Sequence, residues 1–146
     1  MSRKYGQKKP VIKMQTYGIH SKWEAKSKAL PKVLEFTTNI PAQIDIEFGF
    51  IINVKNARGQ KAYYCIEHPG IYDADGSVRS AFTGEVHVTN NDWSFYLGDT
   101  IWTPIDDKCG PWHMTITLND QIIADKTFNV SSVKSDSPIK QRFAYL

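Results

Sequence analysis

One histidine and two aspartates near the middle of the chain carry side chains that could bind a metal ion. His68 follows a strand-like run, and Asp73 and Asp75 lie a few residues further along. Hard cations prefer carboxylate oxygens, and Asp73-Ala74-Asp75-Gly76 copies part of an EF-hand calcium loop. That loop's third acid and closing glutamate are missing, and we assign no metal or other cofactor. His68, Asp73 and Asp75 remain the candidate ligands if the protein is a metal-dependent enzyme, the third choice of function.

The two cysteines could in principle pair with a histidine to form a nucleophile and its base. Cys65 and His68 are three residues apart, so on one strand they point to opposite faces and cannot share a proton. No nucleophile-elbow motif and no glycine-rich phosphate loop occurs in the sequence. The sequence therefore predicts a protein without catalytic activity. Cys109 lies in a turn rather than in a strand, so we expect two free thiols instead of a disulfide across the core.

The basic side chains are concentrated at the N-terminus. Residues 1–32 hold nine lysines and arginines against one acid, whereas residues 33–146 hold nine against fourteen. A basic segment of this kind could bind nucleic acid through phosphate contacts that are independent of sequence and sensitive to salt. The candidate contacts are Lys4, Lys8, Lys9 and Lys13. The alternative, which we favour, is a solvated lysine-rich terminus that keeps the protein soluble or folds back on its own acidic body.

Tryptophan 102 is a candidate for a binding contact. It lies in the turn-rich stretch Gly98-Asp99-Thr100-Ile101-Trp102-Thr103-Pro104. A half-exposed tryptophan near acids could contact a protein or a carbohydrate. The alternative, which we favour, is that Trp102 packs on the core or covers an edge.

The elements that must position these residues are short strands. The clearest is Ile44 to Val54, in which Ile46, Phe48 and the other apolar residues share one parity, predicting one buried and one mostly wet face. Further strands are predicted at the ranges that follow: 11–20, 32–38, 61–67, 82–89 and 93–97, with a short edge piece around Trp102. Ser21-Lys22-Trp23-Glu24 matches a capping box, but no apolar stripe follows and Pro31 is near, so no strong helix is expected. This spacing is typical of an antiparallel sandwich or barrel.

A β-hairpin is predicted from Cys109 to Val130, with alternating apolar residues on both strands. With a two-residue loop at Asn119-Asp120, the apolar residues of the first strand would pair with the residues of the second strand that alternate with its apolar ones. We therefore predict a three-residue loop, Asn119 to Gln121. The pairs expected from it are Leu118 with Ile122, Ile116 with Ala124 and Trp112 with Phe128.

Length and composition suit one domain. The predicted parts are a basic N-terminal arm, residues 1–32, which includes a possible first strand, a β-sandwich domain, residues 33–130, and a C-terminal tail, residues 131–146. No apolar run is long enough to span a bilayer, and no membrane partner is expected. The residues after the basic start are too polar for a signal peptide. We expect a cytoplasmic protein.

Several sequence runs resemble an uncharacterised bacterial family, domain of unknown function 3859. The strongest are Glu67-His68-Pro69-Gly70 and the closing hairpin, from Gly110-Pro111-Trp112 to Lys126-Thr127-Phe128-Asn129-Val130. The runs Ile46-Glu47-Phe48-Gly49-Phe50, Phe82-Thr83-Gly84-Glu85, Asp92-Trp93-Ser94-Phe95 and Gly98-Asp99 belong to the same likeness. It extends from about residue 40 to residue 130 and leaves the N-terminal arm outside. The resemblance implies an immunoglobulin-like sandwich in a bacterial protein, with no activity, ligand or catalytic residue to carry over. Together with the strand pattern, it predicts an antiparallel immunoglobulin-like β-sandwich of about seven to eight short strands.

Together these observations predict a non-enzymatic binding module whose partner is another protein. The expected working surfaces are the exposed sheet edges and the strand-end loops at residues 68–75 and 98–104. Addition of a partner strand to a sheet edge is the expected binding mode. The alternative is a nucleic-acid-associated protein that uses the N-terminal lysines.

Overall fold

The computed structural model of the protein describes residues 8–24 and 29–132. Within these ranges it has nine strands, one short 3-10 helix (η1, Asp106–Lys108) and no α-helix. The strands are β1 (Val11–His20), β2 (Val33–Glu35), β3 (Asn39–Pro41), β4 (Glu47–Lys55), β5 (Lys61–Glu67), β6 (Phe82–His87), β7 (Asp92–Thr100), β8 (Gly110–Leu118) and β9 (Gln121–Ser131). The predicted all-β class is confirmed, with more strands than the seven to eight expected.

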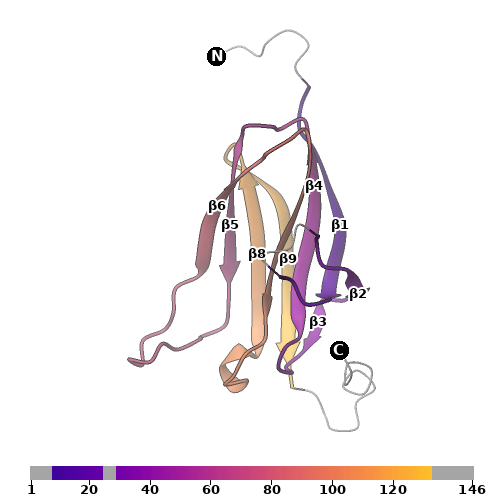
Figure 1. Cartoon of the computed structure of the whole chain (residues 1–146). Coiled ribbons are helices and arrows are strands. Elements are labelled where there is room, and N and C mark those ends of the chain that lie inside the picture. Colours follow the sequence, from indigo (N-terminus) through magenta and orange to yellow (C-terminus); the bar gives the residue numbers. More distant parts are fainter. Residues whose placement is uncertain (1–7, 25–28, 133–146) are drawn as a thin grey trace.

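The strands form two sheets that pack face to face as a sandwich (Figure 1). Sheet A has the order β2-β1-β4-β7, and sheet B has the order β3-β9-β8-β5-β6. All pairs are antiparallel except β3 with β9, which is parallel. β6 and β7 are consecutive in the chain but belong to different sheets, where each is the outermost strand. Within residues 8–24 and 29–132, no further strand pairs with either of them, so one side of the sandwich presents two free edges.

The core lies between the sheets and is built from large aromatic and aliphatic side chains. Phe48 of β4 packs edge-on against Trp112 of β8 and Phe128 of β9, with ring centroids 5.2 and 5.7 Å apart. All three are fully buried. Burial of an aromatic side chain stabilises the fold by about 2–3 kcal/mol, so this trio fixes the two sheets against each other.

The β8–β9 hairpin keeps the predicted register through most of its length. Trp112 pairs with Phe128 and Ile116 pairs with Ala124, as expected. The predicted three-residue loop is wrong, because Leu118 pairs with Gln121 and not with Ile122. The turn is the two residues Asn119 and Asp120, at φ 51° and 63°, which are side chains that tolerate left-handed backbone. The register then shifts between Ile116 and Thr117, and this bulge restores the apolar parity.

Strand β4 is buried on both faces, contrary to the prediction of one wet face. The strand begins at Glu47, since Asp45 has φ 72° and interrupts the extended run that was expected from Ile44. Every residue from Glu47 to Val54 is buried, including Glu47 and Asn53. Neighbouring strands explain the polar burial: Asn53 Nδ2 donates to Asp92 Oδ1 and Ser94 Oγ at 2.7 and 3.1 Å. The outer face of sheet A therefore holds an ordered polar layer.

The segment between β1 and β4 differs most from the prediction. β2 is shorter than the expected strand at 32–38, and β3 lies in a segment for which no strand is predicted from the sequence. Pro41 ends β3 at the sheet edge, a position where proline is tolerated. The capping-box serine does not begin a helix: Ser21 Oγ accepts the Lys32 N–H at 2.9 Å. The residues that would continue that helix, 25–28, lie outside the described residues.

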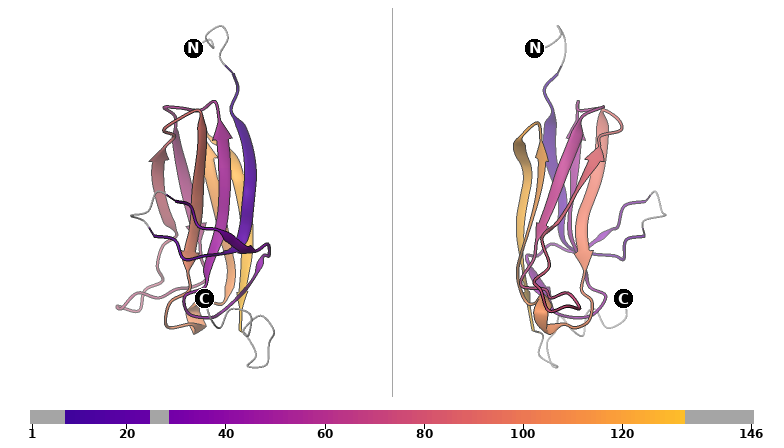
Figure 2. Two further views of the ribbon diagram at one scale, coloured as in Figure 1. Left: turned by 45° about the vertical axis from the view of Figure 1, so that its right-hand side comes forward. Right: turned by 90° about the vertical axis from the view of Figure 1, so that its left-hand side faces the viewer.

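The described parts of the 21–32 connection stand out from the sheets (Figure 2). Both cysteines are free thiols, as predicted. Within the described ranges, the structure contains no helix with the length and hydrophobicity required for crossing a membrane.

Candidate functional site

A groove lies along the open side of the sandwich, between the edge strands β6 and β7. It has a volume of about 420 Å³. Its lining residues come from both sheets and from the 21–32 connection: Trp23, Tyr64, Ile66, Phe82, Glu85, Val86, Phe95, Tyr96, Leu97, Gly98 and Asp99. Most of them are aromatic or aliphatic. An apolar cleft bounded by two unpaired strand edges is the feature of this fold best suited to binding a partner.

The groove is apolar because β6 and β7 direct apolar side chains into the space between their edges, and no strand among the described residues covers that space. Phe82 and Val86 have the inward parity of β6, yet both are only half-buried. Phe95 of β7 and Tyr64 of β5 are half-buried as well, with ring centroids 6.4 Å apart. Side chains of this type would be fully buried if a further strand lay beside β6. The groove therefore leaves these apolar side chains partly accessible.

An aromatic cluster extends from Phe82, one of the residues that line the groove. His68 packs on Phe82 at 4.7 Å and on Trp112 at 6.0 Å, and Trp102 lies 6.3 Å from Trp112. The Lys108 ammonium lies 4.3 Å from the centre of the Trp102 ring, a favourable cation–π distance. Lys108 is completely buried, and its Nζ donates to Pro104 O at 2.8 Å and to Asp107 Oδ1 at 2.6 Å. This network fixes the 102–108 loop against the core.

Asp99 brings a carboxylate to the core-facing side of β7. Burial, reinforced by the nearby Glu47 carboxylate, raises the pKa of Asp99 to about 6. The Thr100 N–H, which donates to Asp99 Oδ1 at 2.8 Å, and the charges of His68 and Lys108 act in the opposite direction on this pKa. The charged form of Asp99 is thus destabilised by its partial removal from water in the groove.

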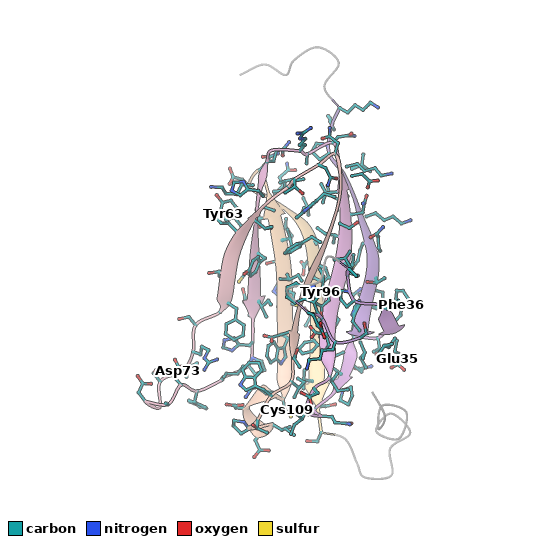
Figure 3. All side chains as sticks on the ribbon, in the orientation of Figure 1. Glu35, Phe36, Tyr63, Asp73, Tyr96 and Cys109 are labelled. Carbon is teal, nitrogen blue, oxygen red and sulfur yellow. The ribbon has the colours of Figure 1, made fainter. Side chains whose placement is uncertain are left out.

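On the outer side of β7, a buried polar cluster lies beneath the 21–32 connection. Tyr96 Oη donates to Glu47 Oε2 at 2.5 Å, and Thr100 Oγ1 donates to Glu47 Oε1 at 2.7 Å. Burial raises the pKa of the Tyr96 phenol well above its usual range, and the Glu47 charge raises it further, so the phenol stays a donor. Trp23 covers this cluster with its ring 6.0 Å from that of Tyr96, which lies at the middle of the sheet in Figure 3.

Three glycines stand in a row across sheet A, and the last of them, Gly98, makes room for the Tyr96 ring. Gly18, Gly49 and Gly98 stand directly opposite one another on β1, β4 and β7. A Cβ atom on Gly98 would overlap the Tyr96 phenol and the carbonyl oxygen of Phe48. The Tyr96 ring can therefore pack over Gly98 and reach Glu47 because Gly98 has no side chain.

The structure does not bring the candidate metal ligands together. Asp73 binds Arg79 Nε at 2.8 Å and Asp75 accepts from Ser77, both within the loop that projects at the lower left of Figure 3. His68 Nδ1 and Nε2 face the carbonyl oxygens of Pro69 and Ser80 at 2.5 and 2.8 Å. Both ring nitrogens are thus directed at acceptors. In the described part of the chain, no group of three or more histidine, cysteine, aspartate or glutamate side chains could hold a metal ion.

The other candidate residues lie in different places. Trp102 is half-buried in the aromatic cluster, where the two predicted strand-end loops meet through His68, Trp112 and Trp102. Lys8, Lys9 and Lys13 are exposed, with Lys13 on β1, and Lys4 is outside the described residues. Nucleic-acid binding by these lysines stays a prediction.

Sequence reasoning missed Glu47, Asp99 and the buried Lys108. Glu47 was placed on the face expected to be wet, and the turn composition around Lys108 contains no sign of burial. One signal was available: Gly49 and Gly98 interrupt strand-like runs, and an internal strand glycine often marks a close approach of other atoms.

A comparison with protein families gives a match over residues 8–130 to a domain of unknown function, DUF3859. The chain belongs to this family. The match begins at residue 8, not near residue 40 as expected, and so includes β1, an internal strand of sheet A. A comparison with curated proteins finds no match.

A solved structure shows the same fold. An immunoglobulin-like protein from Pseudomonas aeruginosa superposes with a TM-score of 0.66 at 19% sequence identity, covering 86% of this chain and 99% of the other. The family member described here therefore has an immunoglobulin-like fold, as the resemblance implied.

Proposed function

We propose that this DUF3859 domain is a non-enzymatic binding module that takes up an extended segment of a partner protein in the groove between β6 and β7. The segment would pair with the free edge of β6 as an additional strand. Every second side chain of the segment would then pack against Tyr64, Phe82 and Val86. The observation that carries the proposal is that the inward side chains of β6 are only half-buried beside an unpaired edge. Strand addition would satisfy the edge backbone groups and bury these side chains.

The charge of the groove selects the partner. Among the described residues that line the groove, Glu85 and Asp99 are the ionisable ones apart from tyrosine, and none is basic. Lys61 lies 3.6 Å from Glu85, but both side chains are exposed and this pair contributes little. The partner segment is therefore one that alternates apolar residues with lysine or arginine.

The proposal also places the protein in the cytoplasm. The free thiols of Cys65 and Cys109 support a reducing compartment. Burial raises the pKa of the Cys65 thiol, and the nearby Glu67 charge raises it further, so Cys65 is not a nucleophile poised for catalysis.

The test is a fluorescence anisotropy titration with two labelled nine-residue peptides, one alternating valine with lysine and one alternating valine with glutamate. We expect saturable binding of the basic peptide, with a dissociation constant on the order of 10 μM, and none of the acidic peptide. A basic peptide with a central proline should bind at least about tenfold more weakly, because proline cannot pair as a strand.

A matched pair of variants locates the binding site. Val86→Lys places a charge on the groove floor and should reduce affinity for the basic peptide by at least about tenfold. Val78→Lys makes the same change at an exposed residue outside the groove and should leave affinity unchanged. Equal effects of the two variants, or equal binding of all three peptides, would show that the interaction is general charge attraction and would refute the proposal.

A further inference from the structure

A second cavity lies beside the ends of β1 and β4, away from the groove. Its volume is about 480 Å³. Aliphatic side chains form part of its wall, from Ile19 of β1, Leu34 of β2 and Ile44 and Ile46 before β4. Leu34 and Ile44 are 42% and 46% exposed, so apolar surface at this cavity faces solvent. A ligand with an apolar portion would gain by covering it.

Glu47 also lines this cavity, and it is a buried carboxylate without a cation. Its side chain is 5% exposed. The donors to its two oxygens, Tyr96 and Thr100, are neutral hydroxyl groups. Among residues 8–24 and 29–132, no lysine, arginine or histidine nitrogen lies within 4.0 Å of the Glu47 oxygens. A buried anion of this kind gains more than an exposed one from an arriving cation.

His20, the neighbour of Glu47 across the β1–β4 pair, does not supply that charge. Its Nδ1 must donate to Gly18 O at 3.0 Å, so its Nε2 accepts from the Thr16 hydroxyl at 2.9 Å in the neutral ring. Burial lowers the pKa of His20, while the Gly18 hydrogen bond opposes that effect. The imidazole is therefore neutral near pH 7, and its two nitrogens are already engaged.

Two further oxygen acceptors come from the loop before β4. Gln43 Oε1 is shielded from solvent and has no hydrogen-bond partner among the described residues. Asp45 has φ 72°, and its N–H donates to Ile101 O at 3.0 Å. Gln43 and Asp45 both line the cavity. A shielded amide oxygen without a donor is costly, and a ligand N–H would satisfy it.

We propose that this cavity binds a primary alkylammonium group, with Glu47, Asp45 and Gln43 as acceptors and the aliphatic wall against the methylene chain. An ammonium group has three donors and no acceptor, which matches a set of three oxygen-bearing side chains. Lys22 also lines the cavity, but its ammonium is not within 4.0 Å of any carboxylate in the described ranges. The site is distinct from the β6–β7 groove, so each proposal can fail without the other.

The test is isothermal titration calorimetry of the full chain with pentylammonium chloride, against pentanol and pentanoate as matched apolar and anionic probes. Ionic strength is held constant with sodium chloride. We expect saturable binding of pentylammonium only. An absence of saturable binding, or equal binding of pentanol, would overturn the proposal.

Variants assign the binding to the cavity. Glu47→Gln should weaken pentylammonium binding at least about tenfold, whereas Glu24→Gln, which removes the same charge from an exposed neighbour, should have no effect. Equal losses in the two variants would show surface attraction and overturn the proposal. If Glu47→Gln does not fold, Gln43→Leu keeps every charge and should still weaken binding several-fold; unchanged affinity in that variant would overturn the proposal.

One further probe distinguishes the two possible sources of the ammonium group, a lysine side chain of a partner protein and a free alkylamine. Nα-acetyl-lysine methylamide presents the ammonium as a protein side chain would. Binding as tight as that of pentylammonium, or tighter, supports a lysine side chain of a partner as the natural ligand. Binding at least tenfold weaker supports a free alkylamine.

Discussion

Asp99 is a carboxylate whose environment opposes its charge. Because its folded pKa is raised to about 6 from an ordinary value of 3.8, the folded protein binds this proton more tightly than the unfolded chain does. The contribution of Asp99 to stability is therefore greatest below pH 4 and is lost as the pH rises through 6. The shift corresponds to at most about 3 kcal/mol at neutral pH.

Asp99→Asn should therefore stabilise the protein at pH 7 relative to wild type, by about 1–2 kcal/mol, with the gain disappearing at pH 4. Urea denaturation at pH 4, 5.5 and 7 measures this difference. Asp106→Asn, the same change at an exposed aspartate of η1, is measured as the matched control. A gain for Asp99→Asn that is equal at all three values would contradict the assignment.

Gly98 is required by close approach rather than by backbone conformation. Gly98→Ala should destabilise the fold by about 2–3 kcal/mol, because the added methyl group would overlap the Phe48 carbonyl oxygen and the Tyr96 phenol. Gly70→Ala is the matched control: nothing lies within 4 Å of its Cβ position, and a change of about 0.5 kcal/mol is expected. Thermal unfolding of both variants measures the contrast, and similar stabilities would argue against the packed position of Tyr96.

Among the elements, the β8–β9 hairpin shows how a turn and a bulge share the control of register. The two-residue turn at Asn119-Asp120 matches the right-handed twist of its strands. By itself this turn would pair the apolar residues of β8 with the residues of β9 that alternate with its apolar ones. The register shift beyond Thr117 corrects this, so both features are needed to bring Phe128 opposite Trp112.

The turn should tolerate or favour glycine and reject β-branched residues. Asp120→Gly should raise stability by up to about 0.5–1 kcal/mol, whereas Asp120→Val should lower it by about 1–2 kcal/mol, because Asp120 has φ 63°. Chemical denaturation of the two variants gives both values. Equal stabilities would mean that this position does not hold left-handed backbone in solution.

At the scale of the whole molecule, β1 joins the N-terminal region to the sandwich. It pairs with both β2 and β4 and contributes Ile19 to the buried core. The backbone is held even before the strand begins, since Asn56 Nδ2 donates to Lys9 O at 3.3 Å. Lys13 therefore lies on sheet A, and Lys8 and Lys9 directly precede its strand β1.

A chain without residues 1–32 should consequently fail to fold, because β4 would lose its β1 partner and the core would open. A chain without residues 1–7 should keep the wild-type circular dichroism spectrum and unfold cooperatively. Circular dichroism and size-exclusion chromatography of the two truncated chains provide the test. A folded, monodisperse chain beginning at residue 33 would show that β1 is dispensable for the sandwich.

The sequence by itself determined the class of fold, the apolar faces of β5 and β8, and much of the β8–β9 register. These features follow from local alternation and from the turn residues, which act over a few positions of the chain. It did not determine the loop length at Asn119, the parallel strand β3, or the burial of Glu47 and Lys108. Their environment is made by segments far apart in the sequence, such as β7 beside β4 and Trp102 over Lys108. Only the tertiary structure placed β6 and β7 in different sheets, and so created the groove, because sheet order depends on packing between distant strands.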